Sequence, residues 1–448
     1  MNEIFQLPLH SSDPNAPSVL KELRAGFTTF LTLAYILFVN PDILSKAIDT
    51  GSADLFAQLL CSTALAAAAG CFIMGFLANY PFALAPGMGL NAFFAFTVVL
   101  GHGLSWKTAF AAVFCGGLIF VVLSLSGLRA RLLDAIPLVL KQAMGAGIGF
   151  FLAIIGCVNG GLITADPITL VKLGNLSQPA PLLTLFGLLL TSILLAKKIR
   201  GAIVGGIIAT STIAITTGAE VFQGKAFAGF STGFVALPRW PVDIAFQLDF
   251  SGLLTPVAIS VILSFLLVDF FDTAGTLYGL ASKANYLDKK GQLPRASRAF
   301  LADAFSTTLG ALLGTSPTTT YIESASGIED GGKTGLTAIF VGIMFLLAIF
   351  FWPLASAIPS VATAPVLIIV GAMMMHASAE IDWHSYHTSI PAFLTIIGMP
   401  LSFSISNGIA LGMLAYAVIH LATGRGREVS PLLYLMATLL CYLLFNGG

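Results

Sequence analysis

Long apolar runs separated by short polar breaks occupy almost the whole of this 448-residue chain. Apolar residues make up 57% of the sequence and charged residues only 9%, whereas about a quarter of the residues in a soluble domain are charged. A helix needs about 20 apolar residues to cross the hydrocarbon core of a bilayer, so the chain has room for a dozen or more crossings. The sequence therefore predicts an all-α polytopic protein embedded in the lipid bilayer and excludes a soluble globular fold.

The few charged residues and the cysteines exclude several classes of function. Lys+Arg and Asp+Glu both number 21, so no net positive field favours a nucleic-acid partner. The five cysteines lie inside apolar runs without CxxC spacing, which is typical of core packing, and we expect no bound metal and no cofactor. Residues 1–20 lack the basic start and apolar stretch of a signal peptide, so none is expected.

The apolar runs divide into two sets of seven predicted spans. The first set comprises residues 26–44, 55–79, 82–101, 106–126, 138–159, 181–196 and 202–217. The second set comprises residues 255–282, 298–315, 317–330, 334–354, 360–376, 389–402 and 406–422. A further run, 431–446, is compatible with a fifteenth crossing or with a helix at the membrane interface, and hydropathy does not separate the two.

The basic residues are distributed unequally between alternate loops. With a cytoplasmic N-terminus, the inner segments hold 16 of the 21 Lys and Arg residues and the outer segments hold five. Cytoplasmic loops of inner-membrane proteins carry such an excess. The bias predicts a multi-pass protein of the inner membrane with a cytoplasmic N-terminus, and it supports the short segments 82–101 and 317–330 as crossings.

These two short segments each contain a proline, Pro86 or Pro317, among small or hydroxyl-bearing residues. In each we expect an extended piece that holds the proline, followed by a short helix that begins within the membrane. The helix is expected to begin near Asn91 in span 3 and near Glu323 in span 10. Broken backbone at this depth must have its amide groups satisfied by other parts of the protein or by a cavity.

The two halves of the chain also correspond in spacing. Pro86 and Pro317 lie 231 positions apart, as do Pro41 and Asp272. Together with an odd number of spans in each half, this spacing favours two inverted seven-span repeats, an architecture of many secondary transporters. The substrate is then expected where the two half-helices meet.

Four acidic residues lie in apolar sequence without a Lys or Arg beside them: Asp269, Asp272, Asp303 and Glu323. An ionised carboxylate at mid-bilayer costs about 3 kcal/mol or more, so each must face a cavity, find hydrogen-bond donors or hold a proton. Asp269, Asp272 and Thr276 fall on one helical face, as expected for a pathway. The alternative, that Ser, Thr and backbone amides bind these acids as structural elements, stays open, above all for Asp269 and Asp303.

Glu323 and Asn91 are expected at the starts of the two half-helices, where free N–H groups favour anions and acceptor atoms. A carboxylate, an amide and these backbone groups offer donors and acceptors to a planar heterocycle. Phe93, Phe94 and Tyr321 are close enough in sequence to stack on it, although each is also compatible with core packing or with a lipid-facing position.

Five motifs carry a resemblance to a known family. They are GFTTFLTLAYILFVNPDIL in span 1, ALAPGMGLNAFFAF in span 3, FFDTAGT in span 8, GTSPTTTYIESASGIEDGGKTGLTA in spans 10 and 11, and VATAPVLIIVGAMM in span 12. In this order, and nearly end to end, the chain resembles the AzgA-like purine nucleobase permeases of the nucleobase:cation symporter family. The resemblance implies fourteen spans in two inverted repeats and proton-coupled uptake of purine nucleobases across the inner membrane, often by a homodimer.

The resemblance also implies a core domain of spans 1–4 and 8–11 and a gate domain of spans 5–7 and 12–14. On this chain the core comprises residues 26–126 and 255–354, and the gate comprises residues 127–220 and 355–424. The remaining segments are a cytoplasmic N-terminal segment, 1–25, an extracytoplasmic loop, 221–254, and a C-terminal apolar segment, 425–448.

Individual residues match the family pattern. Asp272, Asp303 and Glu323 match the acids of spans 8, 9 and 10. The third span, with Gly89 and Asn91, resembles guanine and hypoxanthine carriers more closely than an adenine-type branch, so we favour hypoxanthine and guanine over adenine. Asp269 departs from the pattern, because relatives can have a neutral residue such as Asn at this position. Its role as a second protonation site or as a structural residue stays open.

The residues lead to one hypothesis, transport by alternating access. The expected substrate-binding residues are Asp272, Glu323, Asn91, Gly89, Thr276 and Thr320, and the expected proton-coupling residues are Asp272, Asp303 and Glu323, with Asp269 as the open case. An intramembrane enzyme is disfavoured, since DTAG resembles part of an aspartic-protease loop but HExxH, GxGD and GxSG are absent.

Two further hypotheses stay open at this point. The first is an adenine-preferring permease of the same family. The second is an anion carrier or channel of the same fold, which would prefer basic or neutral groups in place of Asp272 and Glu323 beside the half-helices.

Overall fold

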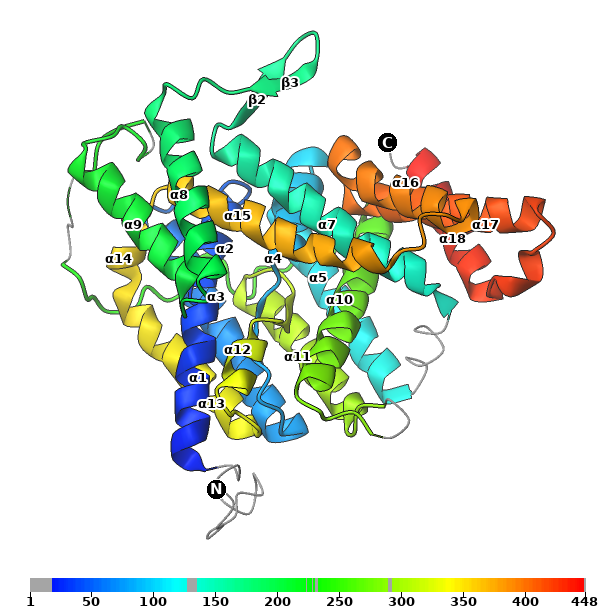
Figure 1. Ribbon diagram of the computed structural model, residues 1–448, viewed down its shortest axis with the longest axis horizontal. Coiled ribbons are helices and arrows are strands. Elements are labelled where there is room, and N and C mark those ends of the chain that lie inside the picture. The colour runs from blue at the N-terminus through cyan, green and yellow to red at the C-terminus, as the bar shows by residue number, and fades with distance from the viewer. Residues whose placement is uncertain are drawn as a thin grey trace.

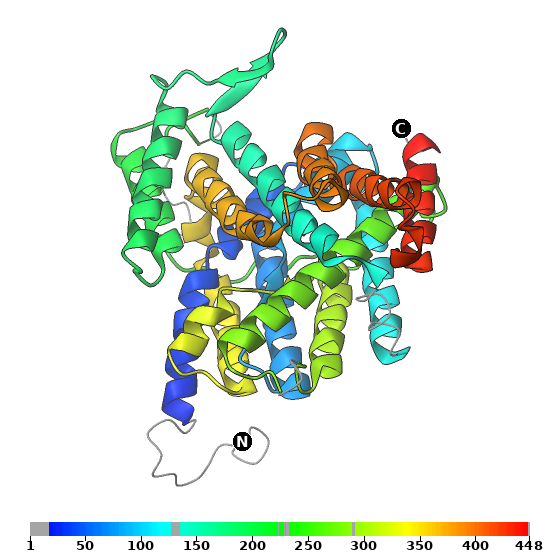
Figure 2. The ribbon, with the colours of Figure 1, turned by 45° about the vertical axis from the view of Figure 1, so that its right-hand side comes forward.

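The computed structural model describes residues 18–126, 135–222, 224–227, 229, 233–288 and 292–446. In these residues the chain forms a bundle of tilted helices, with the start of α1 at one end and a small β-hairpin at the opposite end (Figure 1, Figure 2). Residues 1–17, which carry most of the signal-peptide expectation, lie outside the described part. So do four residues of the orientation count, Arg129, Arg131, Lys289 and Lys290.

Within the described residues, nine helices are long and apolar enough to cross a membrane. They coincide with nine of the predicted spans, and the helical polytopic class is therefore confirmed. They are α1 with α2 (Val19–Leu33, Ile36–Leu44), α3 with η1 (Leu55–Ile73, Met74–Ala78), α5 (Trp106–Ser126), α7 (Leu138–Asn159), α8 (Pro179–Ala196), α10 (Pro256–Lys283), α13 with α14 (Gly335–Ala348, Trp352–Ser356), α15 with η4 (Ser360–Met374, Met375–Glu380) and α17 (Ile405–Ala422).

The remaining five predicted spans contain shorter or more polar helices, so the count of fourteen stays a prediction. They are α4 with η2 (Met88–Ala92, Phe93–Gly101), α9 (Ala202–Thr216), α11 (Ala296–Leu313), α12 (Ser324–Glu329) and α16 (Tyr386–Ser402). Extended chain interrupts spans 3 and 10, and α11 carries Asp303 among several hydroxyl side chains. Length and hydropathy alone therefore do not identify these segments as crossings.

A β-hairpin and a C-terminal helix lie outside the fourteen predicted spans. The strands β2 (Ile163–Asp166) and β3 (Leu170–Leu173) form an antiparallel hairpin between the fifth and sixth spans, where no regular element is predicted. The run 431–446 forms α18 (Pro431–Asn446), which packs against α10 and α17. Leu433 and Leu440 of α18 are buried, so this helix is part of the bundle.

Two three-residue strands pair in the interior of the bundle. β1 (Leu84–Pro86) and β4 (Thr318–Thr320) are antiparallel, with Leu84 opposite Thr320 and Pro86 opposite Thr318. All six residues are buried. The extended pieces predicted in spans 3 and 10 are therefore present, and each is the partner of the other.

The helix that follows each strand begins where the strand contact ends. In span 10, α12 begins at Ser324, directly after Glu323, as predicted. In span 3 the helix begins at Met88, three residues before the start predicted near Asn91. The reason is local: the pairing with β4 ends at Pro86, and the next amide, that of Gly87, donates to the Pro317 carbonyl at 2.8 Å.

A pair of glycines allows one of the closest helix contacts, within the small-residue run GAGIG at 145–149. Gly149 of α7 and Gly371 of α15 face each other, and a Cβ atom at Gly149 would lie 2.6 Å from the Gly371 carbonyl oxygen. Small residues of this kind bring helix backbones together inside a membrane. The α7–α15 contact therefore depends on the absence of side chains at this crossing.

We expect Gly149→Ala to lower the thermal stability of the protein in detergent, because overpacking of this kind costs about 1–3 kcal/mol. Gly145→Ala, one turn earlier in α7, is the matched control, since its Cβ would lie 3.7 Å from the Ala377 Cβ, an ordinary contact. Thermal unfolding of both purified variants checks the prediction. Equal unfolding temperatures for the two variants would contradict it.

Candidate functional site

Where β1 and β4 cross, the backbone amides next to the two strands are hydrogen-bonded within the protein. The Tyr321 amide donates to the Ala83 carbonyl at 3.0 Å, and the Ala83 amide donates to the Ser324 hydroxyl at 2.9 Å. Broken backbone within a membrane is tolerated where the protein satisfies it. In this fold the two broken spans satisfy one another.

A cavity of about 840 Å³ lies beside this crossing. Its walls come from α7, α10, α15, the β1–α4 turn and the segment from β4 to Glu323. Many lining side chains are apolar, among them Met88, Met144, Ile148, Val268, Phe271 and Met373. An apolar cavity of about 300–1,000 Å³ with a few polar groups is typical of a small-molecule site.

The structure brings most, but not all, of the predicted site residues to this cavity. Those that line it are Asp272, Glu323, Gly89, Thr276 and Thr320. Those that do not line it are Asn91, Asp303 and Asp269. The predicted residues therefore form two groups, one at the cavity and one in the packed interior behind it.

Glu323 is held by Tyr35, a residue absent from the predicted site. The Tyr35 hydroxyl donates to Glu323 Oε1 at 2.8 Å. Tyr35 lies at the junction of α1 and α2, is buried and lines the same cavity. A tyrosine in an apolar run provides no sequence signal of its own, because its ring packs as an apolar group and tyrosine is enriched at membrane interfaces.

Asp272 faces the cavity from α10 without a hydrogen-bond partner among the described residues. The same holds for the hydroxyl of Thr276, one turn later. A partly buried carboxylate needs a donor, a proton or solvent. Together with Tyr278, these two side chains are the polar groups that the α10 wall contributes to the cavity.

Asp303 lies behind the cavity wall and is fully hydrogen-bonded. Its Oδ1 accepts from the Thr320 amide and hydroxyl, both at 2.8 Å, and its Oδ2 accepts from the Thr273 hydroxyl at 2.6 Å. The residue is completely buried. Asp303 thus ties α11 to both α10 and β4, and the Thr320 hydroxyl is already committed to it.

Asp269 has far fewer donors than Asp303. Its Oδ2 accepts from the Thr307 hydroxyl at 2.7 Å, whereas Oδ1 has no partner among the described residues. The side chain is buried between α10 and α11. The predicted polar stripe of α10 is therefore divided, since Asp272 and Thr276 reach the cavity and Asp269 does not.

Asn91 belongs to a buried polar cluster beside the strands. Its Nδ2 donates to Asn40 Oδ1 at 3.0 Å, and Asn40 Nδ2 donates to the hydroxyls of Thr63 and Thr315 at 2.8 and 2.9 Å. The Asn91 Oδ1 has no partner in the described part of the chain. Because the helix begins at Met88, Asn91 lies one turn inside it, and Gly89 instead reaches the cavity.

The aromatic residues are distributed differently from the stacking hypothesis. Phe93 and Phe94 are buried and pack on Phe265 and Phe110, with ring centroids 5.0 and 4.8 Å apart. Tyr321 does line the cavity, and its hydroxyl donates to the Pro86 carbonyl. For the two phenylalanines, the core-packing alternative is the one that the structure supports.

Several other polar residues outside the predicted site also line the cavity, among them Glu380, Tyr278 and Thr319. Gln142 at the start of α7 donates from Nε2 to Glu380 Oε2 at 2.8 Å, and Lys141 and His376 lie in the same wall. These residues stand at the ends of apolar runs, where polar side chains are common. Their position in the sequence therefore did not separate them from ordinary loop residues.

The fold and the site together define a helical multi-pass membrane protein with an internal small-molecule cavity. The fold is similar to the transmembrane domain of the cyanobacterium bicarbonate transporter BicA, with a TM-score of 0.59 and 16% sequence identity. That similarity covers 86% of this chain and 96% of the BicA domain. At this level of identity it concerns the fold alone.

The particular family follows from the sequence comparisons. The model of the Permease family, Xan_ur_permease, matches residues 20–411, and the chain belongs to this family. The guanine/hypoxanthine permease PbuO of Bacillus subtilis is 43% identical over 435 residues, which cover 96% of this chain and 98% of PbuO. The adenine permease AdeP of Escherichia coli is 40% identical over 440 residues, covering 98% and 94%. The relatives are permeases, so the protein is a nucleobase-type permease and not an enzyme.

Proposed function

We propose that the protein is a proton-coupled secondary active transporter that imports purine nucleobases by alternating access, with hypoxanthine and guanine preferred. One observation carries the proposal. Three carboxylates line the apolar cavity beside the strand crossing: Glu380 accepts from Gln142, and Asp272 and Glu323 keep oxygens available to a ligand. Asp272 has no hydrogen-bond partner among the described residues, and Glu323 is bound by Tyr35 through Oε1. Acceptors aimed into an apolar cavity suit a flat, N–H-bearing heterocycle.

The proposed binding mode assigns a role to each group at the cavity. Glu323 Oε2 and Asp272 accept hydrogen bonds from ring or exocyclic N–H groups of the base. The hydroxyl of Thr276 donates to a ring nitrogen or carbonyl, while Thr320 holds Asp303 and Gly89 provides a flat wall. Asn91 supports that wall from the interior through its contact with Asn40.

Proton coupling is assigned to the acids at and behind the cavity. Asp272 and Glu323 exchange protons with the cavity, and Asp303 links them to the interior through Thr320 and Thr273. Charge neutralisation on proton binding would let a neutral base enter an otherwise anionic site. Asp269, with a single donor among the described residues, is included as a second proton site.

The proposed layout has fourteen spans in two inverted repeats in the bacterial inner membrane, with a cytoplasmic N-terminus and a homodimeric assembly. The antiparallel pairing of β1 with β4, one strand from each half, supports the repeat. The packing also supports separate core and gate domains. The core group contains α1, α3, α5, α11 and α13, and the gate group contains α7, α8, α9, α15, α16 and α17.

Two competing functions share this fold. An anion carrier is disfavoured, because three acidic residues, Asp272, Glu323 and Glu380, outnumber the one basic residue, Lys141, among the charged residues that line the cavity. An adenine-preferring permease is closer, because both guanine/hypoxanthine and adenine permeases are among the relatives. Adenine has an amino group where hypoxanthine has a carbonyl. At that position adenine therefore needs an acceptor from the protein, whereas hypoxanthine needs a donor.

Glu323→Gln should abolish proton-driven accumulation of labelled hypoxanthine and raise its KM about tenfold or more, because a hydrogen bond to an ionised group contributes about 1.5–3 kcal/mol. Uptake is measured with and without an inward proton gradient at matched expression. Glu428→Gln, an exposed glutamate outside the cavity, is the control and should behave as the native protein. Unchanged gradient-dependent accumulation in Glu323→Gln would refute the assigned role.

Tyr35→Phe removes only the hydroxyl that binds Glu323 Oε1. We expect the KM for hypoxanthine to rise by about tenfold, because the carboxylate is no longer held toward the base. Tyr434→Phe removes a hydroxyl whose bond is to Gly426, outside the cavity lining, and should leave the KM unchanged. Equal KM values for the two variants would exclude a positioning role for Tyr35.

Competition of labelled hypoxanthine uptake by unlabelled bases identifies the substrate class. Guanine and hypoxanthine should compete best, adenine less, and uracil least, because the cavity and its two available acids suit a fused ring with N–H groups. Inhibition by adenine that exceeds inhibition by guanine would favour the adenine permease. Competition by bicarbonate in place of purines would favour an anion carrier.

A further inference from the structure

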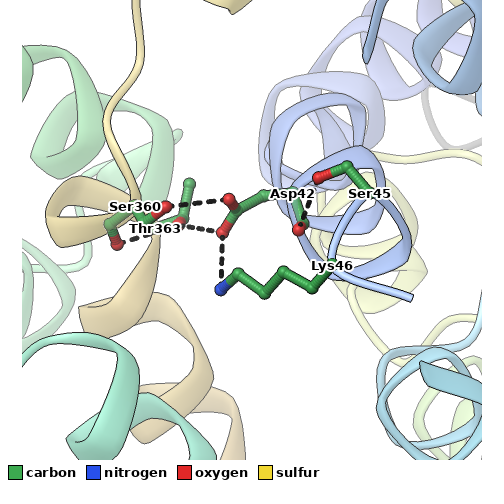
Figure 3. Close-up of polar contacts among 5 residues, drawn as sticks. All are labelled: Asp42, Ser45, Lys46, Ser360 and Thr363. Carbon is green, nitrogen blue, oxygen red and sulfur yellow. Dashed lines mark hydrogen bonds and ion pairs between the residues drawn. The ribbon is translucent and has the colours of Figure 1, made fainter. Parts of the chain in front are cut away.

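A second cluster of polar contacts joins the proposed core to the proposed gate, away from the cavity (Figure 3). Asp42, near the end of α2, accepts hydrogen bonds from two hydroxyls in the first turn of α15. Ser360 Oγ donates to Asp42 Oδ1 at 2.9 Å, and Thr363 Oγ1 donates to Oδ2 at 3.0 Å. Lys46, one turn beyond Asp42, places its Nζ 3.7 Å from the same Oδ2.

This contact and the cavity lie at different ends of the same two helices. On α2, Tyr35 at the first end lines the cavity, and Asp42 follows seven residues later, a rise of about 10 Å. On α15, the residues that line the cavity begin at Val370, and Ser360, the first residue of the helix, lies ten positions earlier, about 15 Å away along the axis. In the proposed orientation, the contact is on the extracytoplasmic side.

We propose that Asp42, Ser360 and Thr363 form an outer clasp, which holds core and gate together on the extracytoplasmic side in this conformation and opens when the carrier turns outward. The inference rests on the proposed alternating access, because it requires the two domains to move relative to each other. The contact of Asp42 with Ser360 and Thr363 must then break during that movement.

The chemistry of the outer clasp suits a contact that is either fully made or fully lost. Serine and threonine side chains are short, and a hydrogen bond is lost when the separation exceeds about 3.5 Å. A small shift of α2 along α15 therefore breaks both bonds together. Packed interfaces of this kind switch between discrete arrangements rather than stretch.

Two of the three clasp residues, Thr363 and Asp42, have another interaction available once the outer clasp opens. The Thr363 hydroxyl also lies 3.0 Å from the Ser360 carbonyl, an acceptor within its own helix. Lys46 stays next to Asp42 on the same segment and balances its charge. Opening therefore leaves the Thr363 hydroxyl and the Asp42 carboxylate with partners, so the open state carries no large desolvation penalty at either group.

A different contact between core and gate involves α1, and it is less sensitive to movement than the outer clasp. Arg200, between α8 and α9, forms an ion pair with Asp330, which also accepts from the Thr28 hydroxyl. The Arg200 side chain is long and 62% exposed, so it can follow Asp330 through a displacement. The outer clasp, with its short side chains, is less able than this ion pair to follow a displacement. Short hydroxyl contacts from Ser264 to Ser406 and from Thr97 to the Phe403 carbonyl also join the proposed core and gate.

The test is a distance measurement between core and gate that needs no substrate. Spin labels are placed at Asp49, exposed beyond the end of α2, and at Thr216, the exposed last residue of α9, in a cysteine-free background. Ala214 of α9 packs with Val361 of α15, so the second label reports on the start of α15. Distances are measured by double electron–electron resonance in lipid nanodiscs.

Two independent variants remove the outer clasp, Asp42→Ala from the core side and the double variant Ser360→Ala/Thr363→Val from the gate side. In each, we expect a second population, longer by about 5 Å or more, the scale of a one-turn shift. The ratio of open to closed molecules should rise about tenfold, the effect of losing hydrogen bonds to a charged group. Asp42→Asn, which keeps an acceptor and the shape, should shift the ratio less.

Asp249→Ala is the control, because this loop carboxylate bonds to Ser251 and Thr108, outside the gate. Its distance distribution should match that of the native protein. If both clasp variants are folded and monodisperse but keep the native distance distribution, the outer clasp is refuted. It is also refuted if the distances change in Asp42→Ala but not in Ser360→Ala/Thr363→Val. Since no purine is present, either result leaves the uptake and competition experiments to judge the proposed function separately.

Discussion

The pairing of β1 with β4 is the constraint on which the rest of the structure depends. Unpaired backbone groups inside a membrane cost several kcal/mol each, so two broken spans need other backbone or polar groups to satisfy them, and here each satisfies the other. The antiparallel register from Leu84 to Pro86 against Thr318 to Thr320 does this with three residues from each half. Around it, Asp303 binds the Thr320 amide and hydroxyl and fixes α11 to the strand. The strand pair thus determines where the helices that follow can begin.

The same crossing explains how acids can remain in so apolar a protein. Where chain direction changes within the bundle, helices cannot fill all the space, and the cavity occupies what remains. Asp272 and Glu323 open into it, whereas Asp303 is bound by three donors behind it. Carboxylates of similar sequence context therefore have different environments. The proposed roles follow from that difference: Asp272 and Glu323 bind the substrate, and Asp303 takes part in proton transfer.

Features that change the local hydropathy pattern could be predicted from the sequence. Contacts between residues far apart in the sequence could not. Prolines in short apolar segments indicated the extended pieces, and acids in apolar runs indicated Asp272 and Glu323. Tyr35 was missed because a tyrosine in an apolar run carries no distinguishing signal, although its hydroxyl binds Glu323. The Asp42 contact to Thr363 joins residues 321 positions apart, which no local pattern encodes. The start of the helix that holds Asn91 differs from the prediction by three residues, since the strand contact sets it.

The pairing of strands from opposite halves has a consequence for biosynthesis. Leu84 leaves the ribosome 236 residues before its partner Thr320. At about 5–20 residues per second, this delay is roughly 10 to 50 s. During that time β1 has no partner strand, so its amides must be satisfied by water, lipid head groups or the insertion machinery. The first half of this permease therefore cannot complete its own broken span, and the native interior forms only after the tenth segment arrives.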